Sequence, residues 1–220
     1  MGHLSDMEAM LRKHLCAVDI AEKPFKAEGV NEMTVQAKKT NGVDTEQLHE
    51  TVKAVKSSPK LGEFTFQVNN RWIDGGQNQS EVNLFAGQGQ IFAHKTKYEL
   101  AADEPEILLG SDSAAGPVEH LLHALASCVT TSMVYHAAAR GISIERVESA
   151  LEGDVDLRGF LGLDPSVRNG CQEIRLKLRI KADLTDEQLQ ELGSLGPTFS
   201  PVFDSLRNGV PISVSTERID

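Results

Sequence analysis

The longest segment without a helix breaker, from Pro117 to Arg140, constrains this chain more than any other feature. Proline suits the first position of a helix, Glu119 lies in the expected first turn, and Gly141 follows directly after the end. The pattern predicts one helix of about 23 residues, roughly 35 Å long. A helix of that length spans a small domain, so we expect it at the centre of the fold.

Strand patterns lie on both sides of this helix. Before it, apolar residues alternate with polar ones from Phe64, and a turn at Asp74-Gly75-Gly76 leads to a second strand near Glu81 to Phe85, which predicts a hairpin. A third strand is expected at about Tyr98 to Ala102. Two strands are expected after the helix, from Val147 to Leu157 and from Ile174 to Ile180. The Thr185–Gln188 capping box begins a helix that runs to about Leu192, where Gly193, Gly196 and Pro197 follow. A short helix from Ser200 and a last strand at Val210 to Val214 complete the pattern. Such runs favour an α+β fold with antiparallel sheets over alternating α/β.

The first part of the chain has a different pattern. Apolar residues recur at helical spacing from Met7 to Val18, a second helix is expected at Thr45 to Lys56, and Pro59 closes the section. We therefore expect a helical N-terminal extension over residues 1–60 and one domain over residues 61–220, a size typical of single domains.

Charge and cysteine usage limit the partners and the compartment. The chain has 22 basic and 32 acidic residues, a net charge of −10, which disfavours nucleic acid and anionic membranes as partners. No run approaches the roughly 18 apolar residues of a membrane span. Asp6 and Glu8 do not fit a signal peptide, and an odd set of three cysteines, Cys16, Cys128 and Cys171, fits a reducing compartment, so we expect a cytoplasmic protein.

Cys128 lies midway along the predicted helix, on a face that mixes small, apolar and hydroxyl side chains. It is either a buried structural thiol or a reactive thiolate, and a reactive thiolate here needs a cation from elsewhere, because the helix N-terminus is too far away. His120, His123 and Cys128 are residue types that bind zinc, but His123 and Cys128 lie about 140° apart around the helix, so the three cannot converge on one ion from one chain. We expect neither a metal nor a cofactor.

The segment Gly116-Pro117-Val118-Glu119, followed by an apolar helix up to Cys128, resembles the central helix of the OsmC/Ohr family. Phe199-Ser200-Pro201-Val202 stands where that family carries its second cysteine in a Cys-Pro-Val motif, so the resemblance covers roughly residues 61 to 217. It implies an OsmC-like fold, with antiparallel sheets packed on a long central helix. It also implies an intertwined homodimer with active sites at the subunit interface.

The resemblance further implies thiol-dependent reduction of organic hydroperoxides, a peroxidase activity of the oxidative stress response, with Cys128 as the attacking thiolate. Because Ser200 cannot form a disulfide, the cycle would use a single cysteine and an external thiol reductant, for example a lipoylated protein. Cys171 is a weaker candidate for the resolving thiol. The alternative is a non-catalytic protein of the same fold that binds a small apolar ligand at the dimer interface.

The other site residues each have two interpretations. By resemblance Arg71 stabilises the thiolate and Glu119 holds that arginine, although Glu119 stands nine residues before Cys128, one fewer than in the peroxidases. Otherwise Arg71 is a solvated edge charge and Glu119 a first-turn acid. Ser200 either only caps a helix or also contacts the sulfur or a ligand. Phe160, in an apolar loop, either covers the core or a partner subunit, or lines a substrate pocket.

Overall fold

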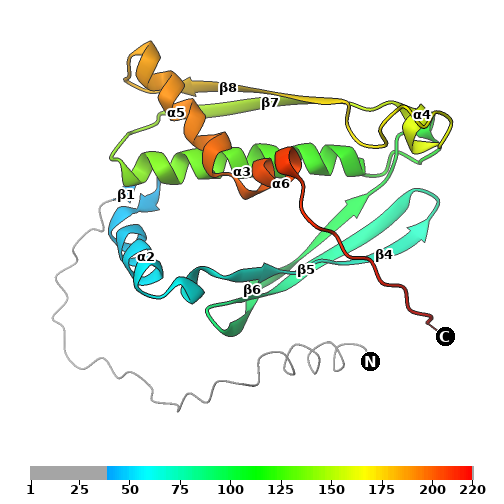
Figure 1. Cartoon of the computed structure of the whole chain (residues 1–220), viewed down its shortest axis with the longest axis horizontal. Coiled ribbons are helices and arrows are strands. Elements are labelled where there is room, and N and C mark those ends of the chain that lie inside the picture. Colours follow the sequence, from blue (N-terminus) through cyan, green and yellow to red (C-terminus); the bar gives the residue numbers. More distant parts are fainter. Residues whose placement is uncertain (1–38, 220) are drawn as a thin grey trace.

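The structure is a computed structural model and describes residues 39–219. Helix α3 (Pro117–Ala139) runs through the middle, with one sheet on each side in the view of Figure 1. The predicted helix from Met7 to Val18 lies outside the described residues. No helix within residues 39–219 is long and apolar enough to cross a membrane.

The long helix is confirmed, and both of its ends have local causes. Pro117 is the first helical residue, and the Glu119 side chain accepts a hydrogen bond of 2.7 Å from the backbone N–H of Gly116, the N-cap. Gly141, at φ +71°, follows the C-terminal end. One stripe of the helix is buried, at Leu125, Val129, Met133 and Ala137.

The first sheet contains four antiparallel strands, β3 (Phe64–Phe66), β4 (Asn69–Asp74), β5 (Gln77–Gly87) and β6 (Gln90–Ala102). β5 pairs with β3 and β4 along one edge and with β6 along the other, so the predicted hairpin is confirmed. The predicted first strand is two strands, because the register on β5 changes between Phe66 and Asn69. The third strand is longer than predicted, since a register shift beside Val82 accommodates the charged residues in its middle.

The second sheet is the antiparallel pair β7 (Arg146–Asp154) and β8 (Glu173–Lys181). The alternation of β8 is confirmed, with exposed charges between half-buried apolar residues. The prediction that the first of these strands reaches Leu157 is wrong. Asp156 accepts a hydrogen bond from the Arg158 N–H and caps the short helix α4 (Leu157–Phe160), which ends the strand pattern.

Helix α5 (Asp186–Phe199) begins at the predicted Thr185–Gln188 capping box but does not end near Leu192. It continues through Gly193, Gly196 and Pro197, because Gly196 is a contact residue and not a breaker. A Cβ atom on Gly196 would lie 2.7 Å from Val129 Cγ1 and 2.8 Å from the Val129 carbonyl oxygen. The missing side chain therefore lets α5 pack directly on α3.

The core lies where these elements meet. Met133 and Ala137 of α3 pack with Leu192 and Leu195 of α5. Half-buried apolar residues of the second sheet and its flanking loops pack against this cluster: Ile142, Ile144, Val147, Leu178, Ile180 and Leu184.

The C-terminal part is predicted only in part. The short helix from Ser200 is confirmed as α6 (Pro201–Asn208), but the strand expected at Val210 to Val214 is wrong for the single chain. Val210, Ile212 and Val214 are exposed, and no strand within residues 39–219 pairs with them.

Part of the expected extension packs against the rest of the chain. The hairpin β1 (Lys39–Thr40) and β2 (Val43–Asp44) leads into α2 (Thr45–Ser57), which confirms the second predicted helix, and a 3-10 turn follows at Pro59–Gly62. The Asn41 side chain donates to the carbonyl of Ile142 at 2.9 Å and accepts from the N–H of Ile144 at 2.8 Å. The boundary at residue 60 remains a prediction.

The connection from β6 to α3 is organised by one buried carboxylate, Asp103. It accepts hydrogen bonds from the hydroxyl and the N–H of Ser111, from the hydroxyl and the N–H of Ser113, and from the N–H of Glu104. These donors, the Ser111 hydroxyl first, hold the pKa of Asp103 far below its usual range against the opposing effect of burial. The carboxylate thus folds the loop that sets where α3 begins.

We expect Gly196→Ala to lower the free energy of unfolding by about 1–3 kcal/mol, because the added methyl group overlaps the backbone of α3. Gly193→Ala in the same helix is the matched control. Its methyl group would meet only Ile180 Cδ1, at 3.8 Å, so its better helix propensity should leave stability unchanged or slightly raised. Urea denaturation followed by circular dichroism measures both, and equal effects of the two variants would contradict the close contact.

Asp103 should make stability depend on pH. Because its pKa is lower in the folded chain than the usual value of about 3.9, its contribution is complete at neutral pH and is lost as the pH falls below about 4. Asp103→Asn should therefore be less stable at pH 7 and lose less stability between pH 5 and pH 3. Urea midpoints at these pH values test this, with the exposed Asp183→Asn as control, and a parallel pH profile for both chains would contradict it.

Candidate functional site

Cys128 lies half-buried on α3, next to the buried Val129. Its thiol is free, and no hydrogen bond or ion pair reaches its sulfur from any residue between 39 and 219. Among the described residues, nothing polar contacts the Cys128 sulfur.

The residues that follow Cys128 at one-turn intervals are Ser132 and His136, and both contact the end of α5. The Ser132 hydroxyl donates to the carbonyl of Phe199 at 3.3 Å. The His136 ring stacks on the Phe199 ring with centroids 3.7 Å apart and planes 15° apart. The junction of α5 and α6 thus packs on the stripe of α3 that begins at Cys128.

Ser200 lies in this junction and is only 2% exposed. Its hydroxyl accepts a hydrogen bond of 3.1 Å from the N–H of Phe203, which makes it the N-cap of α6, with Pro201 at the first helical position. The capping interpretation is confirmed. No hydrogen bond joins this hydroxyl to Cys128 in the described chain.

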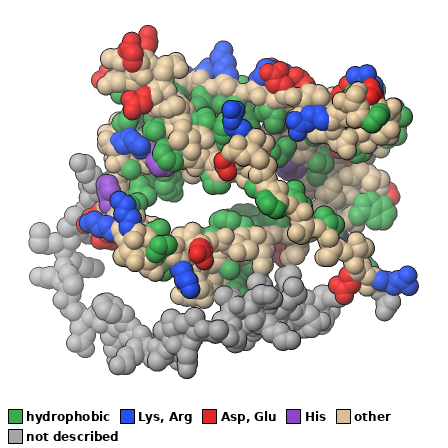
Figure 2. Space-filling model, viewed as in Figure 1, with side chains coloured by type: hydrophobic (Ala, Val, Ile, Leu, Met, Phe, Trp, Pro, Cys, Tyr) green, Lys and Arg blue, Asp and Glu red, His purple; other side chains and the backbone are tan. Residues whose placement is uncertain are grey.

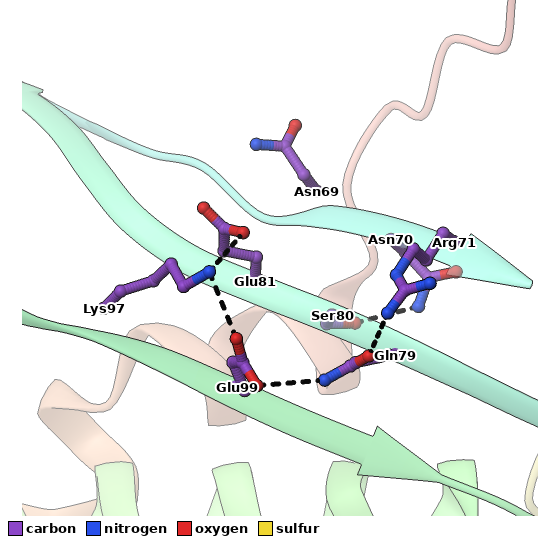
Figure 3. Close-up of a pocket in the computed structure, with 8 residues that line it drawn as sticks. All are labelled: Asn69, Asn70, Arg71, Gln79, Ser80, Glu81, Lys97 and Glu99. Carbon is purple, nitrogen blue, oxygen red and sulfur yellow. Dashed lines mark hydrogen bonds and ion pairs between the residues drawn. The ribbon is translucent and has the colours of Figure 1, made fainter. Parts of the chain in front are cut away.

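Arg71 lies on β4, and its side chain makes no hydrogen bond with Cys128. Its guanidinium donates to the side-chain oxygen of Gln79 at 2.5 Å, and Gln79 donates to Glu99 at 3.1 Å. These side chains line a cavity of about 210 Å³. Figure 3 shows Lys97 between Glu81 and Glu99, with which it forms ion pairs. Gln79 is the only partner that Arg71 has among residues 39–219, so its charge is not neutralised by a carboxylate.

Glu119 is occupied as the capping acid of α3 and makes no ion pair with Arg71 in the described part of the chain. The single chain therefore does not bring Arg71, Glu119 and Cys128 together.

Phe160 is 72% exposed, and its apolar neighbours Leu161 and Leu163 are also exposed. These three side chains therefore do not cover the core formed by residues 39–219.

His120 Nε2 lies 2.9 Å from the carbonyl oxygen of Ala101 and ties α3 to the first sheet. Residues 39–219 contain no group of three histidine, cysteine or acidic side chains placed to hold a metal ion.

Comparison with known proteins agrees with this geometry. Residues 110–215 match the family model of OsmC-like proteins. This segment is similar to OsmC-like proteins. The crystal structure of an OsmC-like protein from Mycoplasma pneumoniae superposes with a TM-score of 0.50 at 16% identity, and the match covers 65% of this chain and 87% of that one.

Two further crystal structures match with lower TM-scores. An organic hydroperoxide resistance protein OsmC from Legionella pneumophila has a TM-score of 0.47 at 16% identity, covering 66% of this chain and 91% of that one. An osmotic stress induced and detoxification response protein from Psychrobacter arcticus has 0.47 at 17%, covering 63% and 85%. No curated protein matches the sequence. The predicted OsmC-like fold is confirmed by the Mycoplasma pneumoniae structure, whose TM-score is 0.50.

The matched segment holds a second free thiol, Cys171, which is half-buried. A Cβ atom on Gly153 of β7 would lie 3.7 Å from the Cys171 sulfur and 3.3 Å from Leu122 Cδ2, so both side chains lie beside Gly153. Leu122 precedes Cys128 by six residues, about 9 Å along the helix.

Sequence reasoning missed Ser132, His136 and Phe199. The sequence signal for Ser132 and His136 was their four-residue spacing after Cys128, which places all three along one face of the helix. Phe199 has no such signal. Burial and the nearby Arg140 lower the pKa of His136, so its ring is neutral at neutral pH.

Ser200→Ala should lower the free energy of unfolding by about 1 kcal/mol, because α6 loses its N-cap. Ser200→Thr keeps the hydroxyl and should lose less. Thermal unfolding compares the two, and an alanine variant as stable as the parent chain would show that the cap contributes nothing.

Proposed function

We propose that this chain is an OsmC-like thiol-dependent peroxidase that reduces organic hydroperoxides through Cys128 alone. The observation that carries the proposal is a free, half-buried thiol in the middle of α3, with the α5–α6 junction packed beside it and Ser200 in place of a second cysteine. The proposed compartment is the cytoplasm, where thiol reductants are abundant.

The cycle balances with one cysteine and two external thiols. The Cys128 thiolate attacks the terminal oxygen of the hydroperoxide, the O–O bond breaks, and the alcohol leaves with a proton, which makes Cys128 a sulfenic acid. One thiol attacks that sulfur, releases water and forms a mixed disulfide. A second thiol releases the Cys128 thiol and leaves as the oxidised disulfide, so a dithiol such as a lipoylated protein serves both steps.

The site needs a second copy of the chain to be complete. Arg71, which would stabilise the thiolate, has only Gln79 as its partner and does not reach Cys128 within its own chain. Figure 2 shows the molecule hollowed between the layer of α3 and the layer of α2 and the first sheet. We therefore propose a homodimer in which Arg71 of the second copy approaches Cys128, with Glu119 nearby to orient it.

Exposed side chains support this dimer. Ala124, Ser127 and Thr131 form an exposed face on α3, and large apolar residues are exposed on the first sheet, with Phe66 at 75% and Trp72 at 71%. Apolar surface of this kind marks a covered interface.

A second candidate function is the binding of a small apolar ligand at that interface without turnover. The engagement of the Ser200 hydroxyl as a cap and the exposed apolar loop around Phe160 favour it. Phe160 would line the ligand pocket in either case.

Consumption of cumene hydroperoxide in the presence of dihydrolipoamide tests the proposal. The parent chain and Cys171→Ser should both consume the peroxide, and Cys128→Ser should lose at least about 90% of the rate, since no other thiol forms the sulfenic acid. Mass spectrometry with a sulfenic-acid trap should find the adduct on Cys128. An unmodified Cys128 after peroxide treatment would overturn the peroxidase and favour the ligand-binding function.

The Ser200→Cys variant adds a check on geometry. A thiol at position 200 should form a disulfide with Cys128 after one equivalent of peroxide, because Ser132, one turn from Cys128, already contacts the neighbouring Phe199. Peptide mapping without reduction detects the bond, and persistent sulfenic acid would show that residue 200 does not reach the sulfur.

A further inference from the structure

The end of α5 is fastened to α3 at two levels around the Cys128 stripe. At the first, Gly196 lies against Val129, the residue after Cys128. At the second, the Phe199 carbonyl accepts a hydrogen bond from the Ser132 hydroxyl, and the Phe199 ring stacks on His136. Helix α6 starts directly after this point, at the buried Ser200.

The His136 ring is itself held in place. Arg140, one turn later, donates to the His136 carbonyl at 2.8 Å, and its guanidinium lies 3.2 Å from His136 Nδ1. A flat ring held at its edge offers a firm surface for stacking, and Phe199, 45% exposed, has no other aromatic partner within residues 39–219. The stack is therefore one of the contacts that hold the last turn of α5 on α3.

Ser132 lies four residues, about 6 Å, after Cys128 on the same face of α3, so the carbonyl group that it binds lies about one turn from the thiol. The α5–α6 junction is thus held to α3 one turn away from the thiol.

We infer that Ser132 and His136 are positioning residues of the Cys128 site. They hold Phe199 so that the α5–α6 junction lets narrow reactants reach the thiol and slows bulky ones. We call Ser132, His136 and Phe199 together the latch. The inference rests on the proposed function for its substrate, a hydroperoxide whose reacting end is narrow. The latch slows the reaction of branched or aromatic disulfides, which would otherwise consume the thiol without turnover.

The test measures the reactivity of Cys128 in a chain that carries Cys16→Ser and Cys171→Ser. Rates are taken with a small reagent, methyl methanethiosulfonate, and with a bulky aromatic disulfide, 5,5′-dithiobis(2-nitrobenzoic acid). His136→Ala should raise the bulky-to-small rate ratio by about fivefold, in line with the strength of one aromatic stack, and Ser132→Ala should raise it less. His136→Phe keeps a flat ring and should stay within about twofold of the parent chain.

His49→Ala, on the exposed face of α2, is the control and should leave the ratio unchanged. A purely structural role would lower thermal stability without changing the ratio, and that result would overturn the latch. Equal ratios for His136→Ala and His136→Phe would also overturn it. If His136→Ala does not fold, Phe199→Leu and Ser132→Ala decide in its place. Because neither reagent requires peroxide chemistry, the outcome does not depend on whether the peroxidase proposal holds.

Discussion

The close contact of α5 with α3 is the constraint on which the rest of this structure depends. Gly196 brings the backbone of α5 against the backbone of Val129, and the buried stripe of α3 then meets Leu192 and Leu195 in the core. A bulkier residue at 196 would separate the helices and move everything that follows, including Ser200 and α6. The geometry beside Cys128 is thus set by the absence of one side chain.

The described residues bury only one face of the central helix α3. The stripe that faces α5 is buried, whereas the face with Ala124, Ser127 and Thr131 is exposed. The first sheet likewise leaves Phe66 and Trp72 exposed, while Asp103 rigidly fixes the loop between that sheet and α3. These exposed faces fit the proposed dimer, because a second copy of the chain would cover them. Folding and assembly would then be linked.

Local signals predicted the fold where they agreed with packing. Pro117, Gly141 and the Thr185–Gln188 capping box mark helix ends that the structure confirms. Gly196 and Pro197 misled the prediction, because a glycine that ends an isolated helix and one that admits a neighbouring helix look the same in sequence. Val210 to Val214 has the pattern of a strand, but a pattern does not supply a pairing edge. At the site, the sequence identified Cys128 and the cap at Ser200, whereas the Phe199 contacts depend on tertiary packing between residues far apart in the chain.

Ser200 affects both the fold and the proposed chemistry, because it caps α6 and stands where a second thiol would be. A hydroxyl is a strong acceptor for the first turn of a helix, and a thiol is a weak one. With serine, α6 has a firm N-cap and the buried position is satisfied by the Phe203 N–H. A cysteine there would be free to react but would cap poorly. Under the proposed cycle, the resolving step therefore passes from the chain to an external thiol, and access to Cys128 becomes the property that the protein must control. The α5–α6 junction, fixed at Gly196 and Phe199, is the part of the structure placed to control it.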